Sequence, residues 1–278
     1  MNTAAAPTVD LINGTRMPRF GLGTWPLDDA GAETAVRRAL DSGYRLLDTA
    51  ENYGNEVGVG RGIAASAVAR EDVFVTTKFN RAWHSIEGAR SAFEASAERL
   101  GVDYIDLLLI HWPNPEQDRY VDAFQGLVEL LREGRVRAIG TSNFKPAHLK
   151  RVLAETGVVP DVNQIQLHPQ AIRTDLRSYH AEHGIVTESW SPIGRGGDLL
   201  EEPVITELAQ RYGKTPAQIV LRWHIELGLV AVPKSADEQR IRQNIDVFDF
   251  ALDSDELARI CALDRGEEPE PDSEVFGH

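Results

Sequence analysis

The chain alternates between two kinds of segment along most of its length, and this alternation is the feature that most limits its fold. Short runs rich in β-branched and aliphatic residues lack a clean polar–apolar alternation, as expected for parallel strands covered on both faces. Eight such runs are predicted, over residues 20–25, 44–47, 73–75, 104–110, 136–139, 162–167, 185–187 and 229–232. Apolar residues at spacings of three and four predict helices over residues 32–40, 86–100, 121–131, 149–153 and 219–227.

Eight strand and helix units in a chain of this length predict a closed (β/α)8 barrel, the TIM barrel, as a single domain over residues 1–278. The alternative is an open doubly wound sheet, which would need a glycine-rich nucleotide-binding turn after its first strand. Residues 21–26 read GLGTWP, with a proline where the third glycine of that turn belongs. The sequence therefore favours the barrel.

Two segments lie outside the eight units. Residues 8–18 surround Asn13-Gly14, a pair that favours a tight β-hairpin because both residues accept positive φ. We expect this N-terminal hairpin to act as a small lid or plug. Residues 265–278 are polar and contain prolines, and we expect a C-terminal tail that lies over the barrel mouth.

Glycines punctuate the predicted helices in two ways. Five helices are followed by a glycine that can take the left-handed closing conformation, namely Gly43, Gly101, Gly134, Gly157 and Gly228. The predicted second helix, over residues 55–68, instead contains glycines at 58, 60 and 62, each costing up to about 1 kcal/mol relative to alanine. This helix is expected to be frayed or packed closely against a neighbour.

The charge balance restricts the possible partners. The 278 residues include 29 Lys and Arg against 43 Asp and Glu, a net charge of -14, which disfavours nucleic acid and anionic membranes. Any anionic ligand must be held by a local basic cluster. Cys261 is the only cysteine and is expected to pack in the last helix, consistent with a reducing compartment. With no signal peptide pattern at the N-terminus, we expect a cytoplasmic monomer.

Polar residues stand at the ends of seven consecutive predicted strands. In a parallel barrel these ends meet at the carboxyl-terminal face, where the active sites of such barrels lie. Each residue alone has an ordinary explanation as a solvated strand end or a core side chain, but their convergence indicates a site. The residues are Asp48, Lys78, His111, Ser142, Asn143, Gln164, Gln166, Glu188, Ser189, Trp190, Ser191, Lys234 and Ser235.

Tyr53 follows Asp48 by five residues and provides a possible proton donor at this face. A tyrosine titrates near ~10 in the absence of perturbation. A buried Lys78 ammonium beside it is expected to lower the pKa of Tyr53, while Asp48 keeps Lys78 charged. Tyr53 would then act as a general acid, and His111 would orient a substrate oxygen by a hydrogen bond.

A basic cluster lies in residues 232–244, VPKSADEQRIRQN. Ser235 and Glu238 have the spacing of a capping box that opens a helix. Lys234 precedes this helix start and Arg240 lies within it, an arrangement that suits a phosphate. The alternative is that both cations pair with nearby acids.

The segments GYRLLDTAENYGNE, TTKF, IHWP, IGTSNF, ESWSPIGRGG and VPKSADEQRIRQN resemble, in the same order and over nearly the whole chain, the aldo-keto reductase family. The resemblance is greatest to small bacterial members of the diketogluconate and methylglyoxal reductase type. It implies NADPH-dependent reduction of small aldehydes and ketones, of dicarbonyl or keto-sugar type, to alcohols. It also implies a catalytic tetrad of Asp48, Tyr53, Lys78 and His111, with Tyr53 as the general acid.

The same resemblance implies binding residues. Cofactor contacts would come from Ser142, Asn143 and Gln164 at the nicotinamide carboxamide, Trp190 on the ring, Ser191, Ile193 and Gly194 at the pyrophosphate, Lys234, Ser235 and Arg240 at the 2′-phosphate, Gln243 and Asn244 at the adenine, and also from Thr24 and Val232. The substrate pocket would be walled by Trp25, Trp83, His111, Trp112 and the tail. Thr141 departs from the family, which often has an aliphatic residue there.

Other functions find less support. A short-chain dehydrogenase needs Tyr-x-x-x-Lys, which is absent from the sequence, and Leu208 replaces the first glycine of a phosphate loop ending in Gly213-Lys214-Thr215. His180 and His183 lie on an expected surface helix without a third ligand, so no metal is expected. A non-enzymatic NADP(H)-binding subunit that senses redox state remains the alternative function, but the complete tetrad favours an enzyme.

Overall fold

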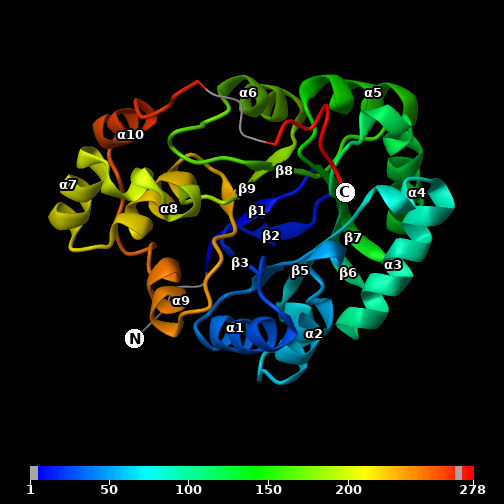
Figure 1. Cartoon of the computed structure of the whole chain (residues 1–278), viewed down its shortest axis with the longest axis horizontal. Helices are drawn as coiled ribbons and strands as arrows, with labels where there is room; N and C mark the ends of the chain where they lie inside the picture. Colours follow the sequence, from blue (N-terminus) through cyan, green and yellow to red (C-terminus); the bar gives the residue numbers. More distant parts are fainter. Residues whose placement is uncertain (1–5, 267–270) are drawn as a thin grey trace.

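Eight parallel strands form the main sheet of the computed structural model, which describes residues 6–266 and 271–278 (Figure 1). Positions 267–270 of the predicted tail lie outside the described residues. The strands are β3 (Gly21–Gly23), β4 (Leu46–Asp48), β5 (Phe74–Phe79), β6 (Ile105–Ile110), β7 (Val136–Ser142), β8 (Val162–Gln166), β9 (Val186–Trp190) and β10 (Val230–Ala231). Each pairs with the next along the chain. Bridges from Phe20 to Ala231 and from Gly23 to Lys234 join the first strand to the last, so the predicted barrel is confirmed.

Helices surround this barrel on its outer side (Figure 1). They are α1 (Asp29–Asp41), α2 (Glu56–Ala64), α3 (Ile86–Leu100), α4 (Tyr120–Arg132), α5 (Pro146–Thr156), α6 (Thr174–His183), α7 (Pro203–Tyr212), α8 (Pro216–Glu226), α9 (Glu238–Ile245) and α10 (Ser254–Cys261). The predicted closing glycines all have positive φ, from +66° at Gly101 to +100° at Gly43. In the described part of the chain, no helix combines the length and the apolarity that a bilayer crossing requires.

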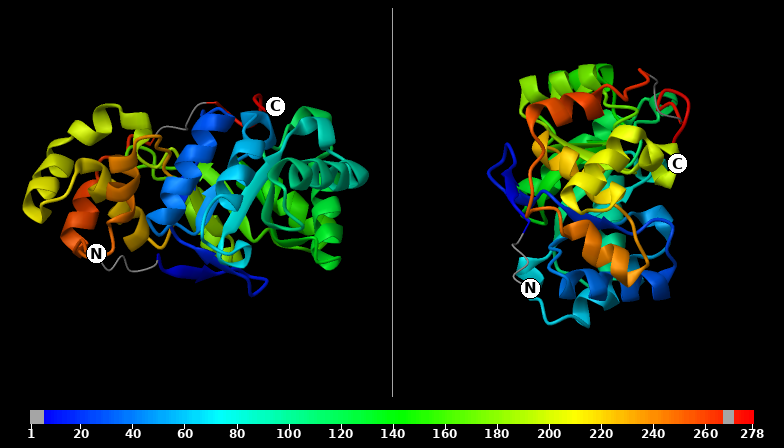
Figure 2. Two further views of the ribbon diagram at one scale, coloured as in Figure 1. Left: turned by 90° about the horizontal axis from the view of Figure 1, so that it is seen from below. Right: turned by 90° about the vertical axis from the view of Figure 1, so that its left-hand side faces the viewer.

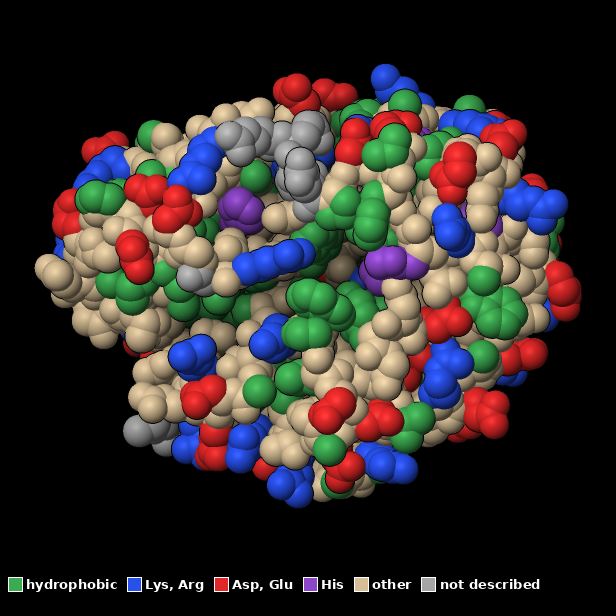
Figure 3. Space-filling model, viewed as in Figure 1, with side chains coloured by type: hydrophobic (Ala, Val, Ile, Leu, Met, Phe, Trp, Pro, Cys, Tyr) green, Lys and Arg blue, Asp and Glu red, His purple; other side chains and the backbone are tan. Residues whose placement is uncertain are grey.

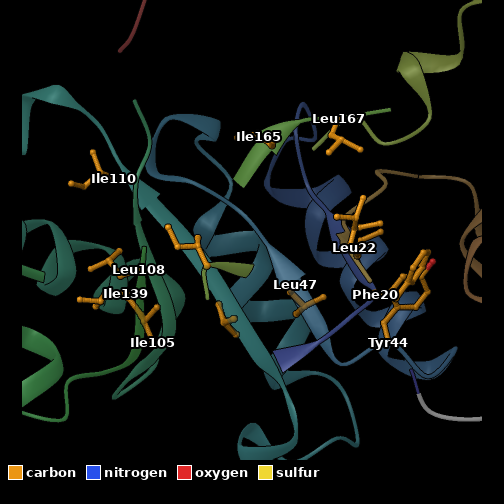
Figure 4. Close-up of a cluster of buried hydrophobic side chains, with 14 of the residues drawn as sticks. Phe20, Leu22, Tyr44, Leu47, Ile105, Leu108, Ile110, Ile139, Ile165 and Leu167 are labelled. Carbon is orange, nitrogen blue, oxygen red and sulfur yellow. The ribbon is translucent and has the colours of Figure 1, made fainter. Parts of the chain in front are cut away.

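Alternate residues of the strands belong to two separate hydrophobic layers. On β6, Leu108 and Ile110 pack in the layer between strands and helices, whereas Leu107 and Leu109 pack inside the barrel. Figure 4 shows part of the outer layer, in which Phe20 lies close to Tyr44, with ring centroids 5.6 Å apart. This alternation explains why the strand sequences lack a polar face: both faces are buried.

The N-terminal hairpin closes the amino-terminal end of the barrel, opposite the C-terminal residues (Figure 2). It consists of β1 (Thr8–Asp10) and β2 (Arg16–Pro18), paired antiparallel. Leu11 and Met17 are buried against the residues inside the barrel, so the hairpin is a plug.

The predicted tight turn of this hairpin is wrong in detail. Gly14 has a φ of +87°, but Asn13 does not take positive φ, and the loop runs from Leu11 to Thr15. The Asn13 side chain instead donates hydrogen bonds to Asp161 Oδ2 at 3.0 Å and to the Arg137 carbonyl at 2.9 Å. Tertiary contacts with the barrel therefore replace the local turn preference.

The three glycines of α2 allow close packing against neighbouring backbone. A Cβ atom at Gly58 would lie 2.1 Å from the Asp29 carbonyl oxygen, and one at Gly60 would lie 2.1 Å from the Leu100 carbonyl oxygen. At Gly62, a Cβ would lie 2.8 Å from the Val36 side chain. The lost helix propensity is thus offset by contact with α1 and α3, and the expectation of close packing is confirmed.

We predict that Gly60→Ala destabilises the fold, because backbone cannot move aside as a flexible side chain can. Overpacking of this kind costs about 1–3 kcal/mol. In a protein of this length, each kcal/mol lost from the free energy of unfolding lowers the melting temperature by about 2–4 °C. The melting temperature should therefore fall by roughly 2–12 °C. Gly197→Ala is the matched control, because its Cβ would have only an ordinary contact at 3.6 Å. Equal melting temperatures for the two variants would contradict the packing argument.

Candidate active site

A cavity of about 270 Å³ opens at the carboxyl-terminal face of the barrel. Figure 3 looks onto this face and shows a hollow at its centre, bordered by hydrophobic, histidine and basic side chains. Most of the predicted site residues line it: Thr24, Trp25, Asp48, Tyr53, His111, Trp112, Ser142, Asn143, Gln164, Trp190, Ser191, Val232 and Lys234. The convergence of strand ends inferred from the sequence is therefore confirmed.

Asp48 and Lys78 form a buried ion pair beneath this cavity. Asp48 ends β4, and Lys78 lies on the adjacent strand β5 with no exposed surface. The Lys78 ammonium donates to both carboxylate oxygens of Asp48 at 2.8 Å and to the Thr49 carbonyl at 2.9 Å. Its remaining contact is with the Tyr53 hydroxyl, at 3.5 Å. The ion pair thus places a fixed positive charge beside the phenol.

The pKa of Tyr53 shifts in the opposite direction to the one expected from the sequence. Burial raises the pKa of Tyr53, and this effect outweighs the lowering by Lys78, while the Asp48 charge raises it further. The predicted net lowering is therefore wrong, because the sequence identifies the cation but not the degree of burial. Burial lowers the pKa of Lys78, yet Asp48 and Tyr53 raise it by more, so Lys78 remains charged as expected. Tyr53 accordingly keeps its proton at neutral pH.

His111 follows β6 directly and stands in the cavity wall as a neutral imidazole. Burial, followed by the Lys78 and His278 charges, holds the pKa of His111 well below its usual value. Its Nδ1 lies 3.0 Å from Oδ1 of Asn52. The Asn52 amide therefore controls which ring nitrogen carries the proton, a function that the sequence did not reveal. When Nδ1 donates to Asn52 Oδ1, Nε2 is an acceptor. When the carboxamide is turned so that Nδ2 faces Nδ1, Nε2 carries the proton and can donate to a substrate oxygen without adding charge.

One hydroxyl and two carboxamides predicted to contact a cofactor lie together near the ends of β7 and β8, on Ser142, Asn143 and Gln164. Asn143 donates from Nδ2 to the His111 carbonyl and to Ser142 Oγ, both at 3.1 Å. Trp190 donates from Nε1 to Asn143 Oδ1 at 2.9 Å, which orients its indole along the cavity. Gln164 donates from Nε2 to Asp48 Oδ2 at 2.7 Å. The Gln164 carboxamide is thus tied directly to the ion pair.

Backbone strain marks the residues that follow β7 and β9. Asn143 and Ser191 have φ values of +63° and +50°, a region that non-glycine residues seldom occupy and that is enriched at functional sites. Arg195 also has positive φ, and its guanidinium lies 5.6 Å from the Trp25 ring centroid and 5.9 Å from that of Trp190. Arg195 lines the cavity but was not identified from the sequence, although it follows the predicted pyrophosphate residues Ile193 and Gly194.

The helix start in the basic cluster differs from the prediction. The proposed Ser235–Glu238 capping box is wrong: α9 is capped by Asp237, whose Oδ1 accepts from Arg240 N at 2.8 Å. Ser235 is buried, and its hydroxyl accepts from Asp237 N at 3.1 Å. The chain makes one further turn before the helix begins, which local spacing does not reveal.

The cations of this cluster are available for a ligand. Lys234 and Arg240 are exposed, and neither forms an ion pair within the part of the chain that the structure describes. The alternative in which nearby acids neutralise both is therefore not supported. Gln243 is half-buried and Asn244 is buried on α9. Arg242, on the same helix, is instead paired with Glu238 at 2.6 Å.

The C-terminal residues cover one side of the cavity, as expected for the tail. Phe276 packs edge-on against Trp112, with ring centroids 4.9 Å apart, and the His278 ring lies 5.4 Å from that of His111. The Arg81 amide donates to the His278 carbonyl at 2.6 Å, which holds this end in place. Pro271, Phe276 and His278 thus join the cavity lining, and the sequence had indicated the tail without these residues.

Some predicted residues lie away from the cavity lining. The Trp83 indole donates to Glu51 Oε1 at 2.7 Å, so its contact with substrate stays a prediction. His180 is buried rather than on the surface, where its ring nitrogens bond Thr187 and Asn163 at 2.8 and 2.9 Å. Over the described ranges, no group of three or more His, Cys, Asp or Glu is arranged to hold a metal ion.

Comparison with known proteins identifies the family. A model of the aldo/keto reductase family matches residues 10–265. The chain belongs to this family. A methylglyoxal reductase, DkgA, of Escherichia coli K12 is 48% identical over 275 residues, covering 98% of this chain and 99% of that protein. An aldo-keto reductase of Mycolicibacterium smegmatis is 48% identical over 274 residues, covering 98% of each chain.

A solved relative supports the same assignment. The crystal structure of a mutant of Gox0644 in complex with NADPH superposes with a TM-score of 0.93 at 40% identity, covering 98% of this chain and 99% of that one. The resemblance drawn from the sequence motifs is thus confirmed. As an aldo-keto reductase, this protein is an NADPH-dependent oxidoreductase that reduces carbonyl groups.

We predict that Phe276→Ala weakens the use of apolar aldehydes by this aldo-keto reductase. Loss of the Phe276 ring removes one aromatic contact with an apolar substrate, of about 0.5–1.5 kcal/mol, so KM should rise roughly 2-fold to 10-fold. The NADPH dissociation constant should stay unchanged, because the tail residues lie beside Trp112 and His111. Val275→Ala is the matched control, since Val275 is 87% exposed. A Phe276→Ala variant with unaltered KM for every aldehyde tested would show that the tail does not contact substrate.

Proposed function

We propose that this aldo-keto reductase reduces small dicarbonyl compounds or keto sugars to alcohols, with Tyr53 as the general acid. The observation that carries the proposal is the Tyr53 hydroxyl, which lies 3.5 Å from the Lys78 ammonium at the cavity floor. The cavity has a small volume and aromatic walls from Trp25, Trp112 and Phe276, which suit a compact carbonyl compound. The relative named methylglyoxal reductase supports the dicarbonyl class.

The chain's own groups provide the proton transfer. His111 orients the carbonyl oxygen by a hydrogen bond from Nε2, which carries the ring proton when the Asn52 carboxamide presents its Nδ2 to His111 Nδ1. Tyr53 donates its hydroxyl proton to the same oxygen as the carbonyl becomes an alcohol. The phenolate that forms is stabilised by Lys78, whose charge is maintained by Asp48. When bound, NADPH supplies the hydride. Tyr53 then recovers a proton from solvent through the open cavity.

The residues present fit NADPH. Lys234 and Arg240 offer two cations for the 2′-phosphate that have no acid partner among the described residues, in a chain whose net charge of -14 would otherwise repel it. Ser142, Asn143 and Gln164 would hold the carboxamide, and Trp190 would stack on the ring. Gln243 and Asn244 would contact the adenine, and Ser191, Ile193 and Gly194 the pyrophosphate.

Removal of the Tyr53 hydroxyl tests the general acid directly. Tyr53→Phe should lower turnover at least ~100-fold, the lower range for general acid catalysis, while NADPH binding persists. Turnover is measured with methylglyoxal as the probe, and binding by fluorescence titration. Tyr104→Phe is the matched control, because the buried Tyr104 hydroxyl has no hydrogen-bond partner among the described residues. Near-normal reduction by Tyr53→Phe would rule out Tyr53 as the acid.

The phosphate site is tested by cofactor preference. A guanidinium that binds a phosphate contributes about 1.5–3 kcal/mol, so Arg240→Ala should weaken NADPH binding roughly 10-fold to 150-fold. NADH lacks the 2′-phosphate, and its dissociation constant should change little. Arg242→Ala is the matched control, because Arg242 is paired with Glu238. Equal losses for NADPH and NADH would mean that Arg240 supports the fold or the adenine instead.

A further inference from the structure

Glu188 is a buried carboxyl group that the proposed mechanism does not use. It lies on β9 with no exposed surface, directly opposite Gln164 of β8 in the strand register. Its Oε2 accepts a hydrogen bond from Gln164 Nε2 at 2.9 Å. A carboxyl group inside a barrel has a desolvation cost that leucine or valine would not have, so its presence there indicates a specific function.

The Gln164 carboxamide is held between two carboxyl groups. Its Nε2 donates to Asp48 Oδ2 at 2.7 Å on one side and to Glu188 Oε2 on the other. A carboxamide has two N–H donors, and both are used by these acceptors. The amide nitrogen is therefore fixed inside the barrel, and the amide oxygen is left over. Gln164 lines the cavity, and its Oε1 makes no hydrogen bond with any described residue.

The charges around Glu188 favour its neutral form. Burial and the Asp48 charge together raise the pKa of Glu188 to about 8, against the lowering by the Gln164 hydrogen bond and by Lys78. Tyr53 is the remaining titratable group that interacts with it. Glu188 Oε1 is buried without a partner within the described chain, which a neutral carboxyl tolerates far better than a carboxylate. At neutral pH, Glu188 thus acts as an uncharged hydrogen-bond acceptor.

We propose that Glu188 is a positioning residue, which locks the Gln164 carboxamide so that its oxygen faces the cavity as the acceptor for a ligand amide. The ligand chemistry is the –NH₂ group of the nicotinamide carboxamide, so the inference rests on the proposed cofactor contact of Gln164. Asp48 alone would use one amide proton and would leave the second free to turn toward the cavity. Glu188 uses the second proton, which removes the competing donor.

The test compares Glu188→Gln with Glu188→Met. Both keep the length of the side chain, but only glutamine retains an oxygen acceptor for Gln164 Nε2. Glu188→Gln should bind NADPH within about 2-fold of wild type, whereas Glu188→Met should bind about 10-fold more weakly, which corresponds to about 1.4 kcal/mol. Dissociation constants for NADPH are measured by fluorescence titration, together with thermal unfolding and KM and kcat for methylglyoxal.

Coupling to Gln164 separates positioning from general support of the fold. Gln164→Met should weaken NADPH binding by itself, and adding Glu188→Met to it should cause no further loss, because the two act through one contact. Thr76→Val on β5 removes a buried hydroxyl that has no partner among the described residues, and this variant should bind NADPH as wild type does. If Glu188→Met does not fold, Glu188→Gln still tests the inference, because a loss of NADPH affinity in that variant would overturn it.

The outcomes distinguish this inference from the proposed function. Unchanged NADPH binding in Gln164→Met would contradict the cofactor contact of Gln164 and the inference with it. Loss of binding in Gln164→Met without loss in Glu188→Met would overturn the Glu188 inference alone. A Glu188→Gln variant as impaired as Glu188→Met would also overturn it, because the charge of Glu188 would then matter rather than its acceptor oxygen.

Discussion

The buried ion pair between Lys78 and Asp48 is the interaction on which the site depends. Neither charge could remain inside the barrel alone, since removal of one partner of a buried pair costs about 3–5 kcal/mol. Together they place a permanent positive charge within 3.5 Å of the Tyr53 hydroxyl and offer Asp48 Oδ2 to Gln164. The proposed proton donor and the amide that faces the cavity are therefore linked through one carboxylate.

The closed barrel makes this arrangement possible. Asp48 ends β4, Lys78 lies on β5, Gln164 on β8 and Glu188 on β9, and these strands are far apart in the sequence. In an open sheet β4 and β8 would not face each other, but closure by the bridges between β3 and β10 brings them across the interior. The N-terminal hairpin packs Leu11 and Met17 against the opposite end of the interior, and the ion pair is itself buried.

The net charge of the chain and the charge of its basic cluster have opposite signs. The net charge of -14 would repel a dinucleotide phosphate, whereas Lys234 and Arg240 provide a positive cluster beside α9 that no described acid neutralises. Other basic residues, such as Lys214 and Arg242, are neutralised by carboxylates at 2.8 and 2.6 Å. Under the proposed function, selectivity for a phosphate depends on which cations are left without an acid, a property of the folded arrangement.

Local patterns in the sequence predict the barrel, its eight strands and the polar residues that meet at its mouth, because parallel strands, helix-closing glycines and polar strand ends each have a recognisable composition. The sequence also left close packing as one of two expectations for α2, which three helical glycines would otherwise leave frayed. Tertiary structure decided the rest. Burial reversed the expected direction of the pKa shift of Tyr53, and Asp237 rather than Ser235 became the cap of α9. The placement of Asn52 and His278 beside His111 depends on distances between remote segments, which no local pattern records.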